Sequence, residues 1–152
     1  MSIVARLEEN ALRPERELAI LLEQAKGDGA IVSFTGIARP SSKAGESVSR
    51  LILEHHPKLT LQSLEDIAVE AAGRFEVTNV QVVHRCGEIG AGDPIVFVAV
   101  SSLHRRAAFE AADYLMDRLK TEAVFWKREV GEGGEQWIEP TDADYADRER
   151  WG

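Results

Sequence analysis

Short connections between strand-like segments constrain the fold of this chain more than any other feature of its sequence. Residues 77–84 (VTNVQVVH) and 94–101 (PIVFVAVS) are rich in β-forming side chains, and several glycines occupy the link between them. Residues 122–130 and 135–139 are also strand-like, and a glycine-bounded turn joins them. Parallel neighbours need a crossover of about a dozen residues or more, so links this short predict antiparallel pairs, the first of them a hairpin.

Three segments carry apolar residues at helical spacing, and they complete the predicted order of elements. They lie at residues 14–26, 60–75 and 105–120, and Pro14 suits the first turn of the first of them. Residues 30–37 and 50–56 are rich in strand formers. The predicted order is therefore αββαββαββ. We expect a single α+β domain over residues 1–152, with three helices and a mostly antiparallel sheet.

Two polar segments are predicted to lie outside this regular structure. Residues 38–49 contain Pro40, Gly45 and several serines directly after Arg39, which predicts a mobile loop able to fold over a ligand. Residues 141–152 are polar, and we expect a flexible tail that becomes ordered against a partner.

The composition excludes several classes of protein. With 44% hydrophobic and 29% charged residues, the chain has an ordinary globular composition. Its net charge of −8 leaves no overall basic footprint for nucleic acid, although a local basic cluster can still bind an anion. No apolar run approaches the roughly 20 residues that span a bilayer, and the N-terminus does not resemble a signal peptide. We therefore expect a cytoplasmic protein without a membrane partner.

The sequence offers little for a metal, a cofactor or disulfide chemistry. Cys86 is the single cysteine, and we expect it to be structural. His55 and His56 are adjacent on a predicted strand, so they would point to opposite faces and could not chelate one metal together. No nucleotide-binding glycine pattern and no Gly-x-Ser-x-Gly motif occur in the required context. We predict neither a metal nor a cofactor.

The densest polar signal begins with His104, Arg105 and Arg106, where a predicted strand ends and a predicted helix begins. Free N–H groups at the start of a helix favour anions, and three basic side chains would strengthen such a site. A solvated basic turn is the alternative interpretation.

Two lysines follow on the next elements. Lys120 closes the predicted third helix, where a cation also interacts favourably with the helix dipole and needs no other function. Lys127 lies on the following strand, and alternation places it on one face with Phe125 and Glu129. A lysine beside apolar surface can have a lowered pKa and act as an acid, a base or a nucleophile.

Residues 104–129 (HRRAAFEAADYLMDRLKTEAVFWKRE) resemble the signature of the molybdopterin synthase catalytic, or large, subunit. The resemblance continues in GAIVSFTGIAR at 29–39, LILEHHPKLT at 51–60 and HRCGEIGAGDPIVFVAVSS at 84–102. Each motif is moderately specific, and their order and spacing together are highly specific.

The resemblance implies an enzyme of molybdenum cofactor biosynthesis that transfers sulfur to cyclic pyranopterin monophosphate and so forms the dithiolene of molybdopterin. The sulfur donor would be a thiocarboxylate on the C-terminal Gly-Gly of a small ubiquitin-like subunit, whose tail enters a pocket. The implied assembly is a homodimer that carries two small subunits, a heterotetramer. With one cysteine, this chain has no dithiol relay of its own, in agreement with an external donor.

The resemblance also implies which residues form the site. Lys120 and Lys127 match the two active-site lysines of the family. Four further positions match residues that line the substrate pocket: Phe34, Arg39, His104 and Arg105. Pro140 and Thr141 stand where some relatives carry an arginine that reaches a neighbouring subunit.

Two other interpretations remain open at this stage. In the first, the same fold only docks a ubiquitin-like tail and catalyses nothing, so the two lysines would be dispensable. In the second, the chain is a regulator that binds a nucleotide or phosphate near Arg105 and needs no thiocarboxylated partner.

Overall fold

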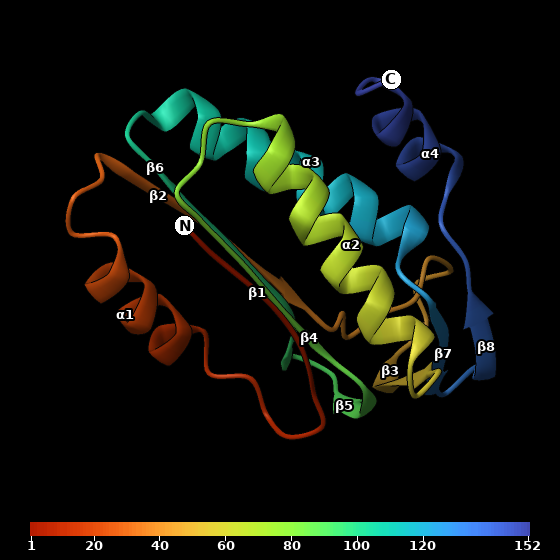
Figure 1. The fold of residues 1–152 in the computed structure, drawn as a ribbon. Helices are drawn as coiled ribbons and strands as arrows, with labels where there is room; N and C mark the ends of the chain where they lie inside the picture. Colours follow the sequence, from red (N-terminus) through yellow and green to blue (C-terminus); the bar gives the residue numbers. More distant parts are fainter.

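The computed structural model describes residues 1–152, which form two four-stranded sheets and four helices (Figure 1). The first sheet has the order β1-β4-β6-β2 and the second the order β5-β3-β7-β8. The strands are β1 (Ser2–Glu8), β2 (Ala30–Ile37), β3 (Val48–His55), β4 (Asn79–Arg85), β5 (Gly87–Gly90), β6 (Pro94–Ser102), β7 (Phe125–Gly131) and β8 (Gly134–Ile138). The helices are α1 (Pro14–Gln24), α2 (Leu59–Arg74), α3 (Arg105–Glu122) and α4 (Asp142–Glu149).

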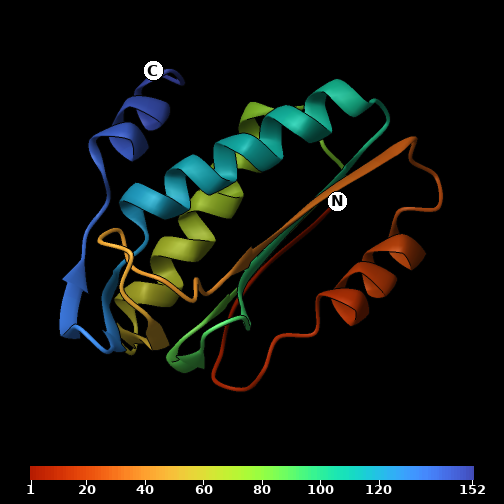
Figure 2. The same ribbon diagram turned by 180° about the vertical axis from the view of Figure 1, so that it is seen from behind.

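The first sheet is covered on both faces. Helices α2 and α3 lie side by side on one face and α1 lies on the other, as the two opposite views show (Figures 1 and 2). The main apolar core fills the space between α2, α3 and the sheet, and its largest fully buried members include Leu64, Ile67 and Leu115. A smaller apolar cluster around Leu21 and Phe97 packs α1 against the opposite face of the sheet. Burial on both faces explains the long apolar run of β6, whereas β4 also buries Asn79 and Gln81, which are hydrogen-bonded to Ser101 and Glu17.

The second sheet lies where α2 begins and α3 ends (Figure 1). A separate small core of Ala38, Leu51, Leu53 and Ile89 lies beneath its strands. Gly87 has φ +85°, a left-handed conformation that favours glycine, and it stands where the chain leaves β4 in the first sheet for β5 in the second. In the second sheet β5 and β7 both pair with β3, and β7 begins directly after the end of α3.

The α+β class and the mostly antiparallel pairing are confirmed. The predicted hairpin exists as the antiparallel pair of β4 and β6, although β5 interrupts the connection. The predicted order is wrong in three places, because β1, β5 and α4 were not predicted. The strand β1 pairs in parallel with the distant β4, a pairing that leaves no local signal, and β5 has only four residues among turn-forming glycines.

The C-terminal segment, predicted as a flexible tail, forms α4 instead. Thr141 and Asp144 make a capping box: the Thr141 hydroxyl accepts the Asp144 N–H (3.1 Å), and the Asp144 carboxylate accepts the Thr141 N–H (2.8 Å). The helix buries no residue of its own, so apolar periodicity could not reveal it. Trp151, just beyond it, packs edge-on against Phe75 and Tyr114.

None of the four helices combines the length and apolar character needed to cross a membrane.

Candidate active site

A cavity of about 440 Å³ opens where the second sheet, the end of α3, the start of α4 and the loop after β2 meet. Its floor is apolar and includes Leu51, Leu53 and Ile95. Its charged lining consists of four cations and three carboxylates, which are Arg39, Lys43, Lys120, Lys127, Glu129, Glu139 and Asp144. The pocket combines an apolar base with convergent charges, which is typical of a site for a polar small molecule or a peptide end.

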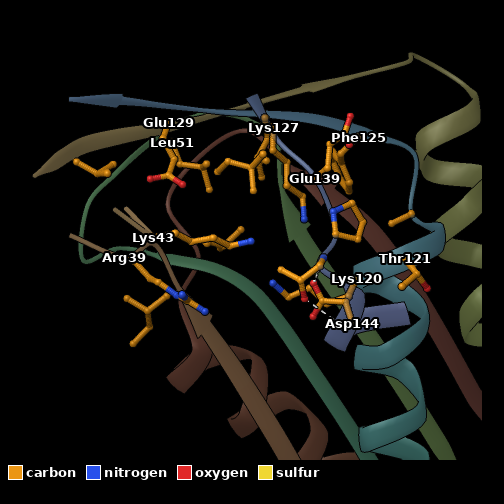
Figure 3. Close-up of a pocket in the computed structure, with 18 of the residues that line it drawn as sticks. Arg39, Lys43, Leu51, Lys120, Thr121, Phe125, Lys127, Glu129, Glu139 and Asp144 are labelled. Carbon is orange, nitrogen blue, oxygen red and sulfur yellow. Dashed lines mark hydrogen bonds between the residues drawn. The ribbon is translucent and has the colours of Figure 1, made fainter. Parts of the chain in front are cut away.

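Lys120 lies in the last turn of α3, whose buried face, including Ala111, Leu115 and Leu119, fixes the helix against the first sheet. This packing directs Lys120 away from the core and into the cavity (Figure 3). The side chain is exposed. It is therefore accessible to a ligand that enters the pocket.

Lys127 lies in β7 between Leu53 of β3 and Ile138 of β8. As predicted from strand alternation, Phe125, Lys127 and Glu129 all line the cavity, and Trp126 points away and is half exposed. Burial, reinforced by the charge of Lys120 and opposed by that of Asp144, lowers the pKa of Lys127 to about 8. Near neutral pH this lysine can therefore gain or release a proton.

His84 is a buried neighbour of the lysines that sequence reasoning did not select. Its ring stacks on Phe125 with the ring centres 4.3 Å apart, and its Nδ1 lies 2.8 Å from the Arg85 carbonyl oxygen. A carbonyl only accepts, so Nδ1 carries the hydrogen. Burial, together with the charges of Lys127 and Lys120, lowers the pKa of His84 to about 3. The imidazole is thus neutral and adds no further positive charge behind the pocket.

Asp144 brings a carboxylate to the pocket from α4 and lies beside Lys120 (Figure 3). Burial disfavours its ionised form, but the hydrogen bonds with Thr141 and the charges of Lys120 and Lys43 outweigh burial and lower the pKa of Asp144. The unpredicted helix therefore supplies an ionised group to one wall of the site.

The structure brings together three of the six residues expected in the site and leaves three outside. Arg39, Lys120 and Lys127 line one cavity. Phe34 is exposed in the middle of β2, paired with Val98. His104 and Arg105 stand at the opposite end of α3, about 22 Å from Lys120 at the usual rise of a helix. Within one copy of the chain, these three residues do not reach the pocket.

No group of three or more His, Cys, Asp or Glu side chains is arranged to hold a metal ion. His56 lies just after β3 and caps α2 instead: its Nδ1 accepts the backbone N–H groups of Lys58 (3.1 Å) and Leu59 (3.0 Å). Cys86 is buried, and burial raises the pKa of its thiol, in agreement with a structural role.

Comparisons with known proteins show the family of this chain. Residues 7–122 match the profile of the family described as MoaE protein. The molybdopterin synthase catalytic subunit of Yersinia pestis is 48% identical over 130 residues, which cover 86% of this chain and 85% of the relative. The structure of molybdopterin cofactor biosynthesis protein E from Burkholderia multivorans has a TM-score of 0.82 at 35% identity and covers 100% of this chain and 98% of its own.

A more distant solved structure shares the fold. It is a complex of subunits 1 and 2 of molybdopterin-converting factor from Helicobacter pylori, with a TM-score of 0.71, 20% identity and 90% of each chain covered. The family match spans most of this chain, and the Yersinia relative is similar over nearly its whole length. This chain therefore belongs to the MoaE protein family of molybdopterin synthase catalytic subunits.

Proposed function

We propose that this chain transfers sulfur from the thiocarboxylated C-terminal Gly-Gly of a small ubiquitin-like subunit to cyclic pyranopterin monophosphate, forming the dithiolene of molybdopterin. The observation that carries this proposal is the convergence of Lys120 and Lys127 on one open cavity with an apolar floor. The tail and the pterin substrate are both anionic, and fixed cations in a partly dry site bind anions more strongly than they would in water.

Lys120 is the residue that receives the tail. It is exposed at the end of a rigid helix, so it can approach a thiocarboxylate that enters the cavity. An ammonium there binds the carboxylate-like end as a charge-assisted pair. The neutral amine can attack the carbonyl carbon of the tail, so that a C–N bond forms, the amine loses a proton and the C–S bond breaks with the electron pair leaving on sulfur.

Lys127 acts at the pterin, where it either transfers a proton or stabilises developing negative charge. Its pKa of about 8 permits both roles, and the pH dependence of turnover separates them. A neutral amine acting as a base predicts a rate that rises through pH 8. An ammonium that stabilises charge predicts a rate that falls over the same range.

Arg39, His104 and Arg105 hold the phosphate and the pterin, and Phe34 lines the same subsite. Because Phe34, His104 and Arg105 lie outside the pocket of their own chain, we propose that a second copy supplies them. Exposed apolar side chains on β2 and around the start of α3 favour such pairing; they are Phe34, Ile37, Leu103 and Phe109. The active assembly would be a homodimer with two small subunits.

Turnover tests this proposal. Purified chain is mixed with cyclic pyranopterin monophosphate and thiocarboxylated small subunit, and dithiolene formation is followed for the native chain and for Lys120→Ala and Lys127→Ala. We expect product from the native chain and losses of roughly 100-fold or more in both variants, as for other groups that act in the transition state.

The alternatives predict different results. Tight binding of the small subunit without any product would favour a module that only docks the tail. Binding of common nucleotides, with neither product nor binding of the small subunit, would favour a phosphate-binding regulator.

A further inference from the structure

The cations of the pocket come from two facing walls. Lys120 and Lys127 stand on α3 and β7, whereas Arg39 and Lys43 stand on the segment that follows β2 (Figure 3). None of the four takes part in any ion pair within the chain. Lys43 was not selected from the sequence, because its segment has the composition of a mobile loop.

The loop that carries Lys43 is hydrogen-bonded. Ser41 and Ser47 form an antiparallel bridge, and within it the Ser42 N–H donates to the Glu46 carbonyl (2.8 Å). The Gly45 N–H donates to the Ser42 carbonyl (2.9 Å), and Gly45 has φ +82°. Lys43 therefore lies in a closed turn, whose backbone direction is set by these bonds.

A second set of contacts anchors this turn to the sheet that bears Lys127. The Ser47 N–H donates to the Glu132 carboxylate (2.5 Å), and the Glu132 N–H donates to the Ser47 carbonyl (3.1 Å). Gly131 permits this approach, since a Cβ there would lie 2.0 Å from the Ser47 carbonyl oxygen. The position of Lys43 relative to Lys127 is thus set by backbone contacts between the turn and the end of β7.

We propose that Lys43 is a third lysine of the site, which binds the phosphate of the pterin substrate together with Arg39. This inference rests on the proposed function, which requires the pocket to hold two anions at once. Lys120 and Lys127 serve the tail and the reacting centre. Within the same chain the opposite wall remains for the phosphate, beside His104 and Arg105 of a second copy. The planar guanidinium of Arg39 can donate two parallel hydrogen bonds, and the flexible side chain of Lys43 adds an ammonium. This combination is well suited to binding a phosphate.

The charge balance of the cavity favours this division. Four cations against Glu129, Glu139 and Asp144 leave one net positive charge before any ligand enters. Asp144 lies beside Lys120 and its charge also acts on Lys43, but it forms an ion pair with neither lysine, so the wall formed by Arg39 and Lys43 stays available to a phosphate. Figure 3 shows the end of Lys43 directed towards the other side chains that line the cavity.

Phosphate binding tests Lys43 independently of turnover. Backbone amide shifts of the native chain are titrated with inorganic phosphate, beside Lys43→Ala, Lys43→Arg and the control Lys26→Ala. Lys26 pairs with Glu23 on α1, across the first sheet, so its loss changes the net charge equally but leaves the pocket intact. We expect phosphate to shift the amide signals of residues 39–47. The Kd for phosphate should rise roughly tenfold in Lys43→Ala and stay near the native value in Lys43→Arg and Lys26→Ala. Equal Kd values for the native chain and Lys43→Ala, or no shifts in the native chain, would overturn the proposal.

Steady-state kinetics give the second test and separate the two proposals. Lys43→Ala should raise the KM for the pterin roughly tenfold, with kcat and the KM for the small subunit nearly unchanged. A fall in kcat at constant KM would contradict a phosphate-binding role. If the native chain forms no product, the proposed function fails, while the phosphate titration still decides the role of Lys43.

Discussion

At the residue scale, Lys127 illustrates how a functional group opposes the stability of its own fold. Its folded-state pKa of about 8 lies below the ordinary value of 10.5, so the unfolded chain binds more protons between these values. Below pH 8 the folded state carries the full cost of a partly buried ammonium, and the cost disappears as the pH rises towards 10.5. We therefore expect Lys127→Met to stabilise the chain by about 1–3 kcal/mol at pH 7, an advantage that vanishes above pH 10.5. Urea unfolding at several pH values measures this, and a variant less stable at pH 7 would refute it.

His84 predicts a dependence at acidic pH. Its pKa is about 3 in the folded chain against an ordinary value of 6.5, so the unfolded chain binds the extra proton as the pH falls below 6.5. This one group should reduce stability by about 1.4 kcal/mol per pH unit between 6.5 and 3. His84→Phe keeps an aromatic ring against Phe125, so its stability should fall less steeply with acid. Parallel slopes for the two proteins in pH-dependent unfolding would contradict this account.

Residues of the site differ in how far the sequence could predict them. Strand alternation alone placed Lys127 with Phe125 on one face, because β7 is regular. Lys43 and Asp144 could not be predicted in the same way, since they come from a turn and from a polar helix without periodicity. Only resemblance pointed to Phe34, whereas the basic cluster at the start of α3 also indicated His104 and Arg105; one chain does not bring these three residues to the cavity.

At the element scale, the contact between the turn and β7 depends on a residue without a side chain. Alanine at position 131 would meet the Ser47 backbone at 2.0 Å, so one of the two segments must move. We expect Gly131→Ala to cost about 1–3 kcal/mol of stability and to weaken phosphate binding as Lys43→Ala does. Thermal unfolding and the phosphate titration check this, with Gly73→Ala, which meets open space in α2, as the control. If Gly131→Ala is destabilised but still binds phosphate with native affinity, the turn does not contribute to phosphate binding.

The helix α4 depends on its cap rather than on a buried face. Removing the Thr141 hydroxyl breaks half of the capping box and should cost about 1 kcal/mol, with Thr141→Ser close to native. Because Asp144 faces the pocket, Thr141→Ala should also shift the pH profile of turnover. A loss of stability with an unchanged profile would mean that α4 only covers the site.

Elements with apolar periodicity were predictable from the sequence. In contrast, α4, β1 and β5 depend on caps or distant partners that local patterns do not encode.

At the scale of the whole molecule, the separation of Arg105 from Lys120 predicts that two defective chains can restore each other. If each pocket takes its lysines from one copy and Arg105 from the other, a mixed dimer of Lys120→Ala and Arg105→Ala has one intact site. Random mixing of the two variants should recover roughly a quarter of native turnover, because half of the dimers are mixed. Activity of the mixture equal to the mean of the separate variants would show that the pocket is not shared.

The contacts of the segment that follows α4 bear on how the pocket would respond to proteolysis. Trp151 is anchored by an indole hydrogen bond to Asp117 (2.6 Å), and its carbonyl oxygen accepts a hydrogen bond from Arg74 (2.5 Å). These bonds join the segment after α4 to Arg74 on α2 and Asp117 on α3. A proteolytic cut after Arg150 would therefore remove one anchor of the wall that contains Asp144, far from any residue that lines the pocket.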